Sequence, residues 1–266
     1  MAIITIITDW HSGDFYLGAV KGKILSLLPE VNVVDISHQL PAFAYIRTAF
    51  ILENSYKSFP KGTVHLVGVN SEASLKNPHI VVMYDGQYFI GADNGIFGLL
   101  FGEKVYKAVN ITKNETTFPE LEVFADAAVY LARGGNFENL GTAYQNLYHP
   151  APMLPTMDNS VINGSVIYID SYSNVITNIN KEIFEKVGKG RRFEILVQSN
   201  HNRITRINKT YNETSNGELL ALFNSGGLLE VSINKGNAAD LLNLGMNSVV
   251  RIKFFDNPER DELKLV

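Results

Sequence analysis

Hydrophobic and polar positions along the first half of the chain alternate in blocks that predict strands and helices in turn. Three β-branched runs are typical of buried strands, at residues 3–8, 31–37 and 63–70. The intervening segments 15–28 and 44–56 place apolar residues at the three- to four-residue spacing of a helix. This alternation predicts an α/β domain built on a mainly parallel sheet.

The segment IVVMYDGQYFIG, residues 80–91, predicts a different kind of strand pairing. Two apolar runs flank Asp85-Gly86, and both residues of such a pair accept the positive φ that a tight hairpin turn requires. We therefore expect an antiparallel hairpin grafted onto the parallel sheet. Further along, the pattern predicts a short helix at 95–101, a strand at 105–112 and a helix at 122–133.

The second half of the chain has a different pattern. Three prolines lie between residues 149 and 160, and the short apolar runs that follow are typical of strands. Only the segments 181–187 and 238–244 have a helical pattern. We predict an α/β ligand-binding domain over residues 1–150, a proline-rich linker over 151–160 and a smaller all-β barrel or sandwich over 161–266.

Composition and charge exclude several classes of function. The chain has 266 residues and a net charge of −4, so it lacks the concentrated Lys and Arg that bind nucleic acid. It has no cysteine, which excludes disulfides, thiolate catalysis and zinc–sulfur sites. The six histidines lack metal-ligand spacing, so we expect no metal. Without a basic leader or an apolar run of about 20 residues, we expect a cytoplasmic protein that does not bind membranes.

Two acidic residues lie where the first strand meets the first helix, in TDWHSGD, residues 8–14. A carboxylate at such a strand end can accept hydrogen bonds from both hydroxyls of a ribose. On this interpretation Asp9 and Asp14 bind a ligand; the alternative is that Asp14 caps the helix and Asp9 closes a turn. Neither G-x-G-x-x-G nor G-x-x-x-x-G-K-[ST] occurs, so a phosphate-binding loop is not indicated.

Polar residues also follow other predicted strands, in the segments 65–77, 91–98, 168–174 and 224–242. Ligands of α/β proteins often bind at strand ends, but each segment also has a simpler interpretation as a loop, a turn or a helix cap. No G-x-S-x-G motif is present, which disfavours a serine hydrolase.

Taken in order, these segments resemble the S-adenosylmethionine (SAM) hydroxide adenosyltransferase family, which is related to the SAM-dependent fluorinating and chlorinating enzymes. ITDWHSGDFYLGAVKGKIL is similar to the family's opening TDFG…D…G..KG, and VVDISHQLPAF to its V-D-I-[TS]-H segment. SFPKGTVHL, ADNG, VIYIDSYSNVITNI and SGGLLEVSINKGNAADLL follow in the family's order. The resemblance implies an N-terminal α/β domain, a smaller C-terminal β-domain and a homotrimer that binds SAM at its subunit interfaces.

The resemblance also implies which residues contact SAM. Asp9 would hold the ribose hydroxyls, and Phe43 would line the ribose or adenine region. Asp14 and Asp170 would face the methionine amino group. The β-domain would also contribute Asn174, Ser225, Asn237 and Ala238.

The reaction implied by the resemblance is displacement of methionine from the ribose C5′ by hydroxide or halide. SAM is itself the substrate or ligand, so no cofactor is implied. A sulfonium leaving group needs no general acid, so the protein has to bind SAM, align the nucleophile and exclude competing water.

The match to the family breaks at the end of the third strand. The family has V-D-P-G-V-G-T-x-R there, whereas this chain has Asn70 in place of the Asp. Asn77, or Lys76 by a slip of one residue, replaces the Arg. The family's F-H-G-R-D aligns with residues 118–122, which puts Pro119 in place of the His. All three residues that order water in the hydrolysing members are therefore predicted to be absent.

Glu72 and Glu120, together with Lys76 and His79, flank the altered positions and are candidates for a replacement water-ordering set; the alternative for each is a solvated loop residue. We consider three hypotheses. The first is a SAM hydrolase that forms adenosine and methionine with an altered water site. The second is a non-catalytic SAM- or adenosine-binding pseudoenzyme. The third is a SAM-dependent halogenase, although nothing in the sequence indicates a halide pocket.

Overall fold

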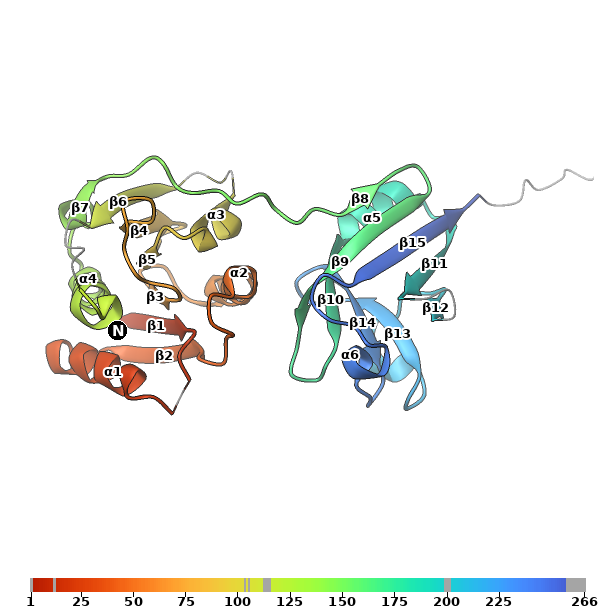
Figure 1. Ribbon diagram of the computed structural model, residues 1–266, viewed down its shortest axis with the longest axis horizontal. Coiled ribbons are helices and arrows are strands. Elements are labelled where there is room, and N and C mark those ends of the chain that lie inside the picture. Colours follow the sequence, from red (N-terminus) through yellow and green to blue (C-terminus); the bar gives the residue numbers. More distant parts are fainter. Residues whose placement is uncertain are drawn as a thin grey trace, which may run out of the picture. The chain divides into compact units, whose positions relative to one another are not determined.

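The computed structural model of the chain describes residues 2–11, 13–102, 104, 106–111, 116–198 and 202–256. The chain divides into two compact units, Met1–Ala151 and Pro152–Val266 (Figure 1). The first unit combines helices with a mixed sheet, and the second is built almost wholly from antiparallel strands. The predicted fold class, α/β followed by a smaller β-domain, is confirmed.

The first unit is organised around one seven-stranded sheet. Its strands run in the order β2 (Asn32–Ser37), β1 (Ile3–Thr8), β3 (Val64–Gly68), β5 (Gln87–Ala92), β4 (His79–Tyr84), β6 (Lys107–Ile111) and β7 (Gly141–Ala143). The pairs from β2 to β5 are parallel, and the pairs from β5 to β7 are antiparallel. The carboxyl ends of β2, β1, β3 and β5 therefore lie at one edge of the sheet.

The predicted hairpin is confirmed in β4 and β5. Tyr84 pairs with Gln87 across the turn. Asp85 has φ 48° and Gly86 has φ 72°, as a two-residue turn with two left-handed positions requires. The hairpin places β5 next to β3 in parallel, so it joins the parallel and antiparallel parts of the sheet.

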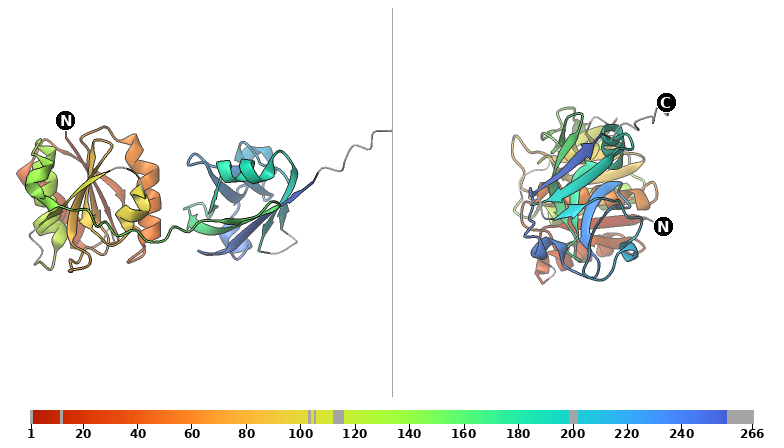
Figure 2. Two further views of the ribbon diagram at one scale, coloured as in Figure 1. Left: turned by 90° about the horizontal axis from the view of Figure 1, so that it is seen from above. Right: turned by 90° about the vertical axis from the view of Figure 1, so that its right-hand side faces the viewer.

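Helices cover both faces of this sheet. Helices α1 (Phe15–Leu27) and α4 (Ala125–Ala132) bury apolar residues in one core with the sheet. Helices α2 (Tyr45–Ser55) and α3 (Ile96–Phe101) do the same in a second core. Figure 2 shows α4 in green and α2 in orange on opposite sides of the strands. The 3₁₀ turns η1 (Tyr56–Ser58) and η3 (Phe137–Leu140) complete the unit.

The helix predicted over residues 122–133 begins earlier than the pattern indicates. A π-helical turn, η2 (Glu120–Phe124), precedes α4. The backbone amides of Leu121 and Glu122 both donate to the Phe118 carbonyl, at 3.1 Å each. A π turn is wider than an α turn, so it changes which residues face the sheet. Glu120, which the α-helical spacing left outside the helix, is the first residue of this turn and is buried.

The second unit is an eight-stranded antiparallel sheet that is nearly closed. Its main path runs β12-β11-β15-β9-β10-β14-β13, and β8 pairs with β9. A bridge between Asn208 and Leu222 connects the segment after β12 to β13, so the two ends of the path approach each other. The strands are β8 (Thr156–Met157), β9 (Val161–Ile169), β10 (Val175–Asn180), β11 (Arg192–Val197), β12 (Arg203–Ile204), β13 (Leu219–Phe223), β14 (Leu228–Ile233) and β15 (Val249–Phe255).

Three short helical elements accompany this barrel-like sheet. They are α5 (Lys181–Gly188), α6 (Ala238–Leu241) and the 3₁₀ turn η4 (Tyr211–Glu213). Helix α6 is shorter than the predicted 238–244, because Asn243 adopts φ 49°, a conformation that ends a helix. No helix in the described part of the chain is long and apolar enough to cross a membrane.

Candidate functional site

Predicted site residues of the first unit lie at the edge of the sheet where its parallel strands end. Asp9 follows β1, Phe43 lies in the connection after β2, and Asn70 follows β3. In an open α/β sheet, loops at this edge are the usual place for a ligand. The topology thus brings these three predicted positions to one edge.

Asp9 organises the loop that carries Phe43. One Asp9 carboxylate oxygen accepts a hydrogen bond from the Phe43 backbone amide at 3.1 Å. Phe43 has φ 62°, an uncommon conformation for an aromatic residue, and its side chain is 59% exposed. Asp14 occupies the N-cap position of α1, but its side chain makes no capping hydrogen bond to the described helix. Its exposed carboxylate is therefore not explained by the capping alternative.

Asn70 makes a side-chain hydrogen bond to helix α2, and the Asn77 backbone makes hydrogen bonds within its own loop. The Asn70 side-chain amide donates to the Tyr45 hydroxyl at 2.5 Å. The Asn77 backbone amide donates to the Ser74 hydroxyl at 3.0 Å, and the Ser74 amide donates to the Asn77 carbonyl at 3.1 Å. Both residues are thus part of the loop structure, and neither supplies charge to the site.

Glu120 and Glu72, the two carboxylates considered as replacements, lie in different environments. Glu72 is exposed. Glu120 is 5% exposed and packs over Gly68, the last residue of β3. A Cβ atom on Gly68 would lie 2.9 Å from Glu120 Cγ and 3.0 Å from Thr8 Cγ2. The glycine therefore leaves the space that the glutamate side chain occupies between the ends of β1 and β3.

The Glu120 carboxyl group is electrostatically unusual. Burial raises its pKa above the ordinary value, and repulsion from Asp9 adds to the rise, whereas the Ser71 hydroxyl opposes it. Ser71 is 7% exposed, and its hydroxyl makes no hydrogen bond of good geometry with a described residue. Perturbed carboxyl groups beside under-bonded polar atoms are enriched in functional sites.

Aromatic side chains adjoin this carboxylate. Trp10, next to Asp9, packs edge-on against Phe118 with ring centroids 5.6 Å apart. Tyr16 contacts both rings, at 5.7 Å from Trp10 and 5.3 Å from Phe118. Because Phe118 lies two residues before Glu120, this cluster connects the Asp9 loop to the π-helical turn.

A buried histidine fixes the end of β1. His38 Nδ1 lies 2.7 Å from the Thr8 hydroxyl, and His38 Nε2 lies 3.1 Å from an Asp35 carboxylate oxygen. The sequence indicated that His38 is an ordinary hydrogen-bonded residue, and these contacts agree with that interpretation. Since Thr8 precedes Asp9, the contacts also position the candidate site.

The ADNG segment after β5 has a structural role. Asp93 is buried and accepts hydrogen bonds from the Tyr144 hydroxyl at 2.7 Å and from the Tyr148 amide at 3.0 Å. Asn94 donates to the carbonyls of Val69 and Asn70, at 2.8 and 3.2 Å. The segment therefore holds the loop after β3 in place.

The second unit contains a cavity of about 770 Å³ at the loop between β9 and β10 and the turn after β14. Three of the predicted ligand residues line it, namely Asp170, Asn174 and Asn237. Ala238 is the next residue along the chain and is fully buried. Ser225 lies in the turn before β14, at the opposite end of that strand, and does not line the cavity.

Asp170 holds the shape of one wall of this cavity. Its carboxylate accepts hydrogen bonds from the amides of Tyr172 and Asn174, at 2.9 Å each, and from the Asn174 side chain at 3.0 Å. Asn237 caps α6, since its side chain accepts from the Asp240 amide at 3.0 Å. These two predicted ligand residues are therefore firmly oriented.

Tyr211 is a cavity residue that the sequence analysis missed. Its hydroxyl donates to Glu230 at 2.7 Å. Glu230 is buried and also accepts from Ser232 at 2.9 Å and from Asn224 at 3.4 Å. Burial raises the pKa of Tyr211, and the bond to Glu230 raises it further, so the hydroxyl stays protonated. A lone glutamate within the apolar run LLEVSI was the available signal.

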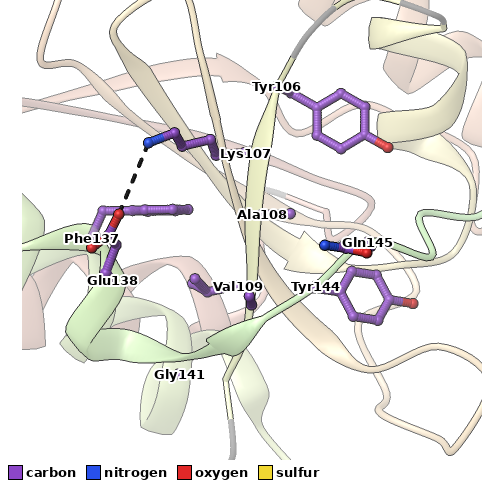
Figure 3. A pocket seen from close by; sticks show the side chains of 10 residues that line it. Tyr106, Lys107, Ala108, Val109, Phe137, Glu138, Gly141, Tyr144 and Gln145 are labelled. Carbon is purple, nitrogen blue, oxygen red and sulfur yellow. Dashed lines mark ion pairs between the residues drawn. The ribbon is translucent and has the colours of Figure 1, made fainter.

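The first unit also contains a cavity, of about 590 Å³, which lies beside β6 and β7. Figure 3 shows Tyr106 and Tyr144 on one side of β6, with Phe137 and Glu138 on the other. The Lys107 ammonium lies 3.9 Å from the Glu138 carboxylate. No predicted site residue lines this cavity. Among the described residues, no group of three His, Asp or Glu side chains is arranged to hold a metal ion.

Comparisons with known proteins identify the family. Residues 4–141 match the model of the SAM hydroxide adenosyltransferase N-terminal domain, and residues 164–251 match that of the C-terminal domain. The chain belongs to the SAM hydroxide adenosyltransferase family. The resemblance seen in the sequence motifs is thereby confirmed.

Similar proteins align with nearly the whole length of this chain. The (R)-S-adenosyl-L-methionine hydrolase of Methanocaldococcus jannaschii is 29% identical over 91% of this chain and 92% of its own length. The (R)-S-adenosyl-L-methionine hydrolase of Thermus thermophilus is 27% identical over 95% of this chain and 100% of its own length. A fluorinase of Actinopolyspora mzabensis is 22% identical over 94% and 96%.

A crystal structure of an uncharacterized conserved protein from Thermotoga maritima matches with a TM-score of 0.84 and 26% identity. The match covers 95% of this chain and 100% of that chain.

Proposed function

We propose that this protein hydrolyses SAM to adenosine and methionine. The observation that carries the proposal is the similarity to (R)-SAM hydrolases along 91% and 95% of this chain, which includes both family domains. The first unit supports it with acidic side chains at its strand ends. The second supports it with a polar cavity of about 770 Å³, within the range of small-ligand sites.

In this proposal, which follows the family resemblance, both units supply residues that recognise SAM. Asp9 accepts the ribose hydroxyls, and Phe43 lies against the ribose or adenine. Asp14 and Asp170 face the methionine amino group. Asn174 and Asn237 supply further contacts from the cavity of the β-domain, and the family resemblance adds Ser225 and Ala238, which do not line that cavity.

The proposed water-handling site differs from that of the hydrolysing relatives. Asn70 and Asn77 stand where the resemblance predicts Asp and Arg, and both are engaged in local hydrogen bonds. Loss of one positioned base costs about 10²–10⁴ in rate, but alignment of the reactants and exclusion of water contribute independently. We therefore propose slow but real turnover by a rebuilt site.

The test is product analysis in isotopically labelled water. Purified protein is incubated with SAM in H₂¹⁸O, and adenosine and methionine are quantified by chromatography and mass spectrometry. Hydrolysis at C5′ predicts equal amounts of the two products, with one ¹⁸O in the 5′-hydroxyl of adenosine. Unlabelled adenosine, or no adenosine at turnover times long enough for several cycles, contradicts the proposal.

The second candidate function is SAM or adenosine binding without turnover. It is favoured by one observation, the Asn70–Tyr45 hydrogen bond, which uses the amide for structure rather than for chemistry. Calorimetry on the same sample distinguishes the two functions, because binding without product supports the pseudoenzyme. A parallel incubation with chloride tests the halogenase alternative, which predicts 5′-chloro-5′-deoxyadenosine.

We also propose a homotrimer with ligand sites at subunit interfaces, which rests on the family resemblance. Size-exclusion chromatography with light scattering should then give about three times the chain mass of 29.5 kDa. A mass near that of one chain, in a sample that turns SAM over, would exclude the trimer without affecting the proposed reaction.

A further inference from the structure

We propose that the Glu120 carboxylate holds the attacking water and accepts its proton in the hydrolysis proposed above, on which this inference rests. The family resemblance offers no counterpart, since the aligned residue of its F-H-G-R-D motif is glycine. The carboxylate of the water site is therefore supplied from a different position in the chain. Residue 70 has lost it, and Glu120 of the π-helical turn provides it.

The placement of Glu120 fits this role. Its side chain enters the sheet edge over Gly68, where the ends of β1 and β3 are neighbours. Asp9, proposed to hold the ribose hydroxyls, immediately follows Thr8 and is close enough to act on Glu120 through its charge. In this proposal the carboxylate lies beside the residue that binds the ribose, the sugar that carries the C5′ carbon.

Ser71 supplies a second polar group for a water. Its hydroxyl is buried, lies near Glu120 and makes no hydrogen bond of good geometry within the described part of the chain. A buried hydroxyl without a protein partner is commonly satisfied by water. The Glu120 carboxylate and the Ser71 hydroxyl together provide the two polar contacts that fix a water's position.

The charged groups around Glu120 leave it free for this task. Asp9, which follows β1, makes the Glu120 carboxyl more basic through its negative charge. His38, packed behind β1, contacts Thr8 and Asp35, and His79 of β4 contacts the Ser71 carbonyl at 2.7 Å. Lys23 of α1 binds the Leu121 carbonyl at 2.7 Å and Asp126 at 2.8 Å.

In the proposed step, the water oxygen forms a bond to C5′ of the ribose while the C5′–S bond breaks. The electron pair of the C5′–S bond stays on sulfur, so methionine leaves as a neutral thioether. One O–H bond of the water breaks, and the proton goes to the Glu120 carboxylate. Glu120 then releases this proton to solvent. A base with a raised pKa is suited to this transfer, because proton affinity increases with pKa.

The decisive experiment compares Glu120→Gln with Glu122→Gln. Glu122 lies in the same π-helical turn but is exposed, so it is a matched control. We expect Glu120→Gln to lower kcat by about 10²–10⁴ with little change in the SAM dissociation constant. Glu122→Gln should keep the parent kcat. If the parent turns SAM over and Glu120→Gln does so equally fast, the assignment is wrong and the proposed function stands.

The pH profile gives a readout that a purely structural role would not change. The base must be ionised, so kcat of the parent should rise with pH through a value above the ordinary 4.5 of a glutamate. Glu120→Gln removes the ionisable group, so this limb should be absent from its profile. A limb that persists unchanged in Glu120→Gln contradicts the assignment. A parent that binds SAM without forming adenosine overturns both the proposed function and this inference.

Folding stability separates loss of chemistry from loss of structure. A raised carboxyl pKa means that the folded state binds the proton more tightly than the unfolded state, so this stabilisation is complete below pH 4.5 and is lost as the pH rises through the folded pKa. Glu120→Gln removes the ionisation, so its melting temperature at pH 7 should equal or exceed that of the parent. A lower kcat with a markedly lower melting temperature would indicate a structural role instead.

Discussion

The cavity of the second unit and the Glu120 site of the first unit use their carboxylates in opposite ways. In the second unit, Asp170 and Glu230 each accept three hydrogen bonds from protein groups. In the first unit, Glu120 lies near the Ser71 hydroxyl and the Asp9 carboxylate, and burial raises its pKa. A carboxylate with three protein hydrogen bonds is fixed in position, whereas one with fewer protein partners can take up water.

This difference suggests a division of labour. The second unit uses carboxylates to fix the walls of a cavity, which favours recognition of a ligand. The first unit holds a carboxylate in an unfavourable environment, which favours chemistry at some cost in stability. Substitutions in the two units should therefore separate binding and stability from rate.

The largest effect is expected for Asp9→Ala in the first unit. It removes the proposed acceptor of two ribose hydroxyls, and hydrogen bonds to a charged group contribute about 1.5–3 kcal/mol each. We expect SAM affinity to fall by about 10²–10⁴, as measured by calorimetry. Asp9→Asn keeps an acceptor for the Phe43 amide and should lose less. If Asp9→Ala bound SAM with unchanged affinity, the proposal that the first unit binds the ligand through Asp9 would be wrong.

Gly68→Ala tests how closely the Glu120 position is specified. The added methyl group would lie 2.9 Å from Glu120 Cγ, so the carboxyl group has to move. A displacement of about 1 Å in a reacting group can cost about 10²-fold in rate, and overpacking costs about 1–3 kcal/mol of stability. Steady-state kinetics and thermal unfolding measure the two effects. Full activity in Gly68→Ala would show that the position of Glu120 is not critical.

Glu230→Gln should give the opposite result in the second unit. It replaces one acceptor oxygen with a donor that faces Tyr211, Ser232 or Asn224, and we expect a loss of about 1–3 kcal/mol in the free energy of unfolding. Urea titration measures this loss. Glu185→Gln, which removes an exposed pair with Lys181, should change stability by at most about 0.5 kcal/mol. If Glu230→Gln lowered kcat without lowering the free energy of unfolding, the proposed division between stability in the second unit and rate in the first would be wrong.

Tyr211→Phe is expected to have the smallest effect. It removes one hydrogen bond to Glu230, worth about 1 kcal/mol, and loosens the ring that borders the cavity. SAM affinity should weaken by about fivefold, measured by calorimetry, with kcat at saturating SAM nearly unchanged. Tyr172→Phe removes a hydroxyl from the same cavity without disturbing a buried carboxylate. An equal effect of the two substitutions would exclude the Glu230 bond as the cause.

Much of the fold was predictable because it follows local rules. The Asp85-Gly86 turn, the helical spacing of residues 15–28 and the strand-rich second half each depend on neighbouring residues. The order of motifs also predicted the family correctly. Several ligand positions could be proposed in the same way, since residues after parallel strands share one edge of a sheet.

The surroundings of Glu120 were not predictable from periodicity. The helical pattern starts at residue 122, whereas the structure has a π-helical turn over Glu120–Phe124 in which Glu120 is buried. The Glu230–Tyr211 bond joins residues 19 positions apart, so no local pattern reveals it. Both features depend on tertiary packing, which overrides the spacing of polar residues along the chain.

The aromatic cluster beside Glu120 has a practical consequence for spectroscopy. Trp10 is the only tryptophan of the chain, and its ring lies 5.6 Å from Phe118, next to the Asp9 loop. Intrinsic fluorescence excited at the tryptophan band therefore originates entirely from the strand-end site. Ligand binding there can be followed by stopped-flow fluorescence without a dye. The second unit contains no tryptophan, so it contributes no tryptophan fluorescence.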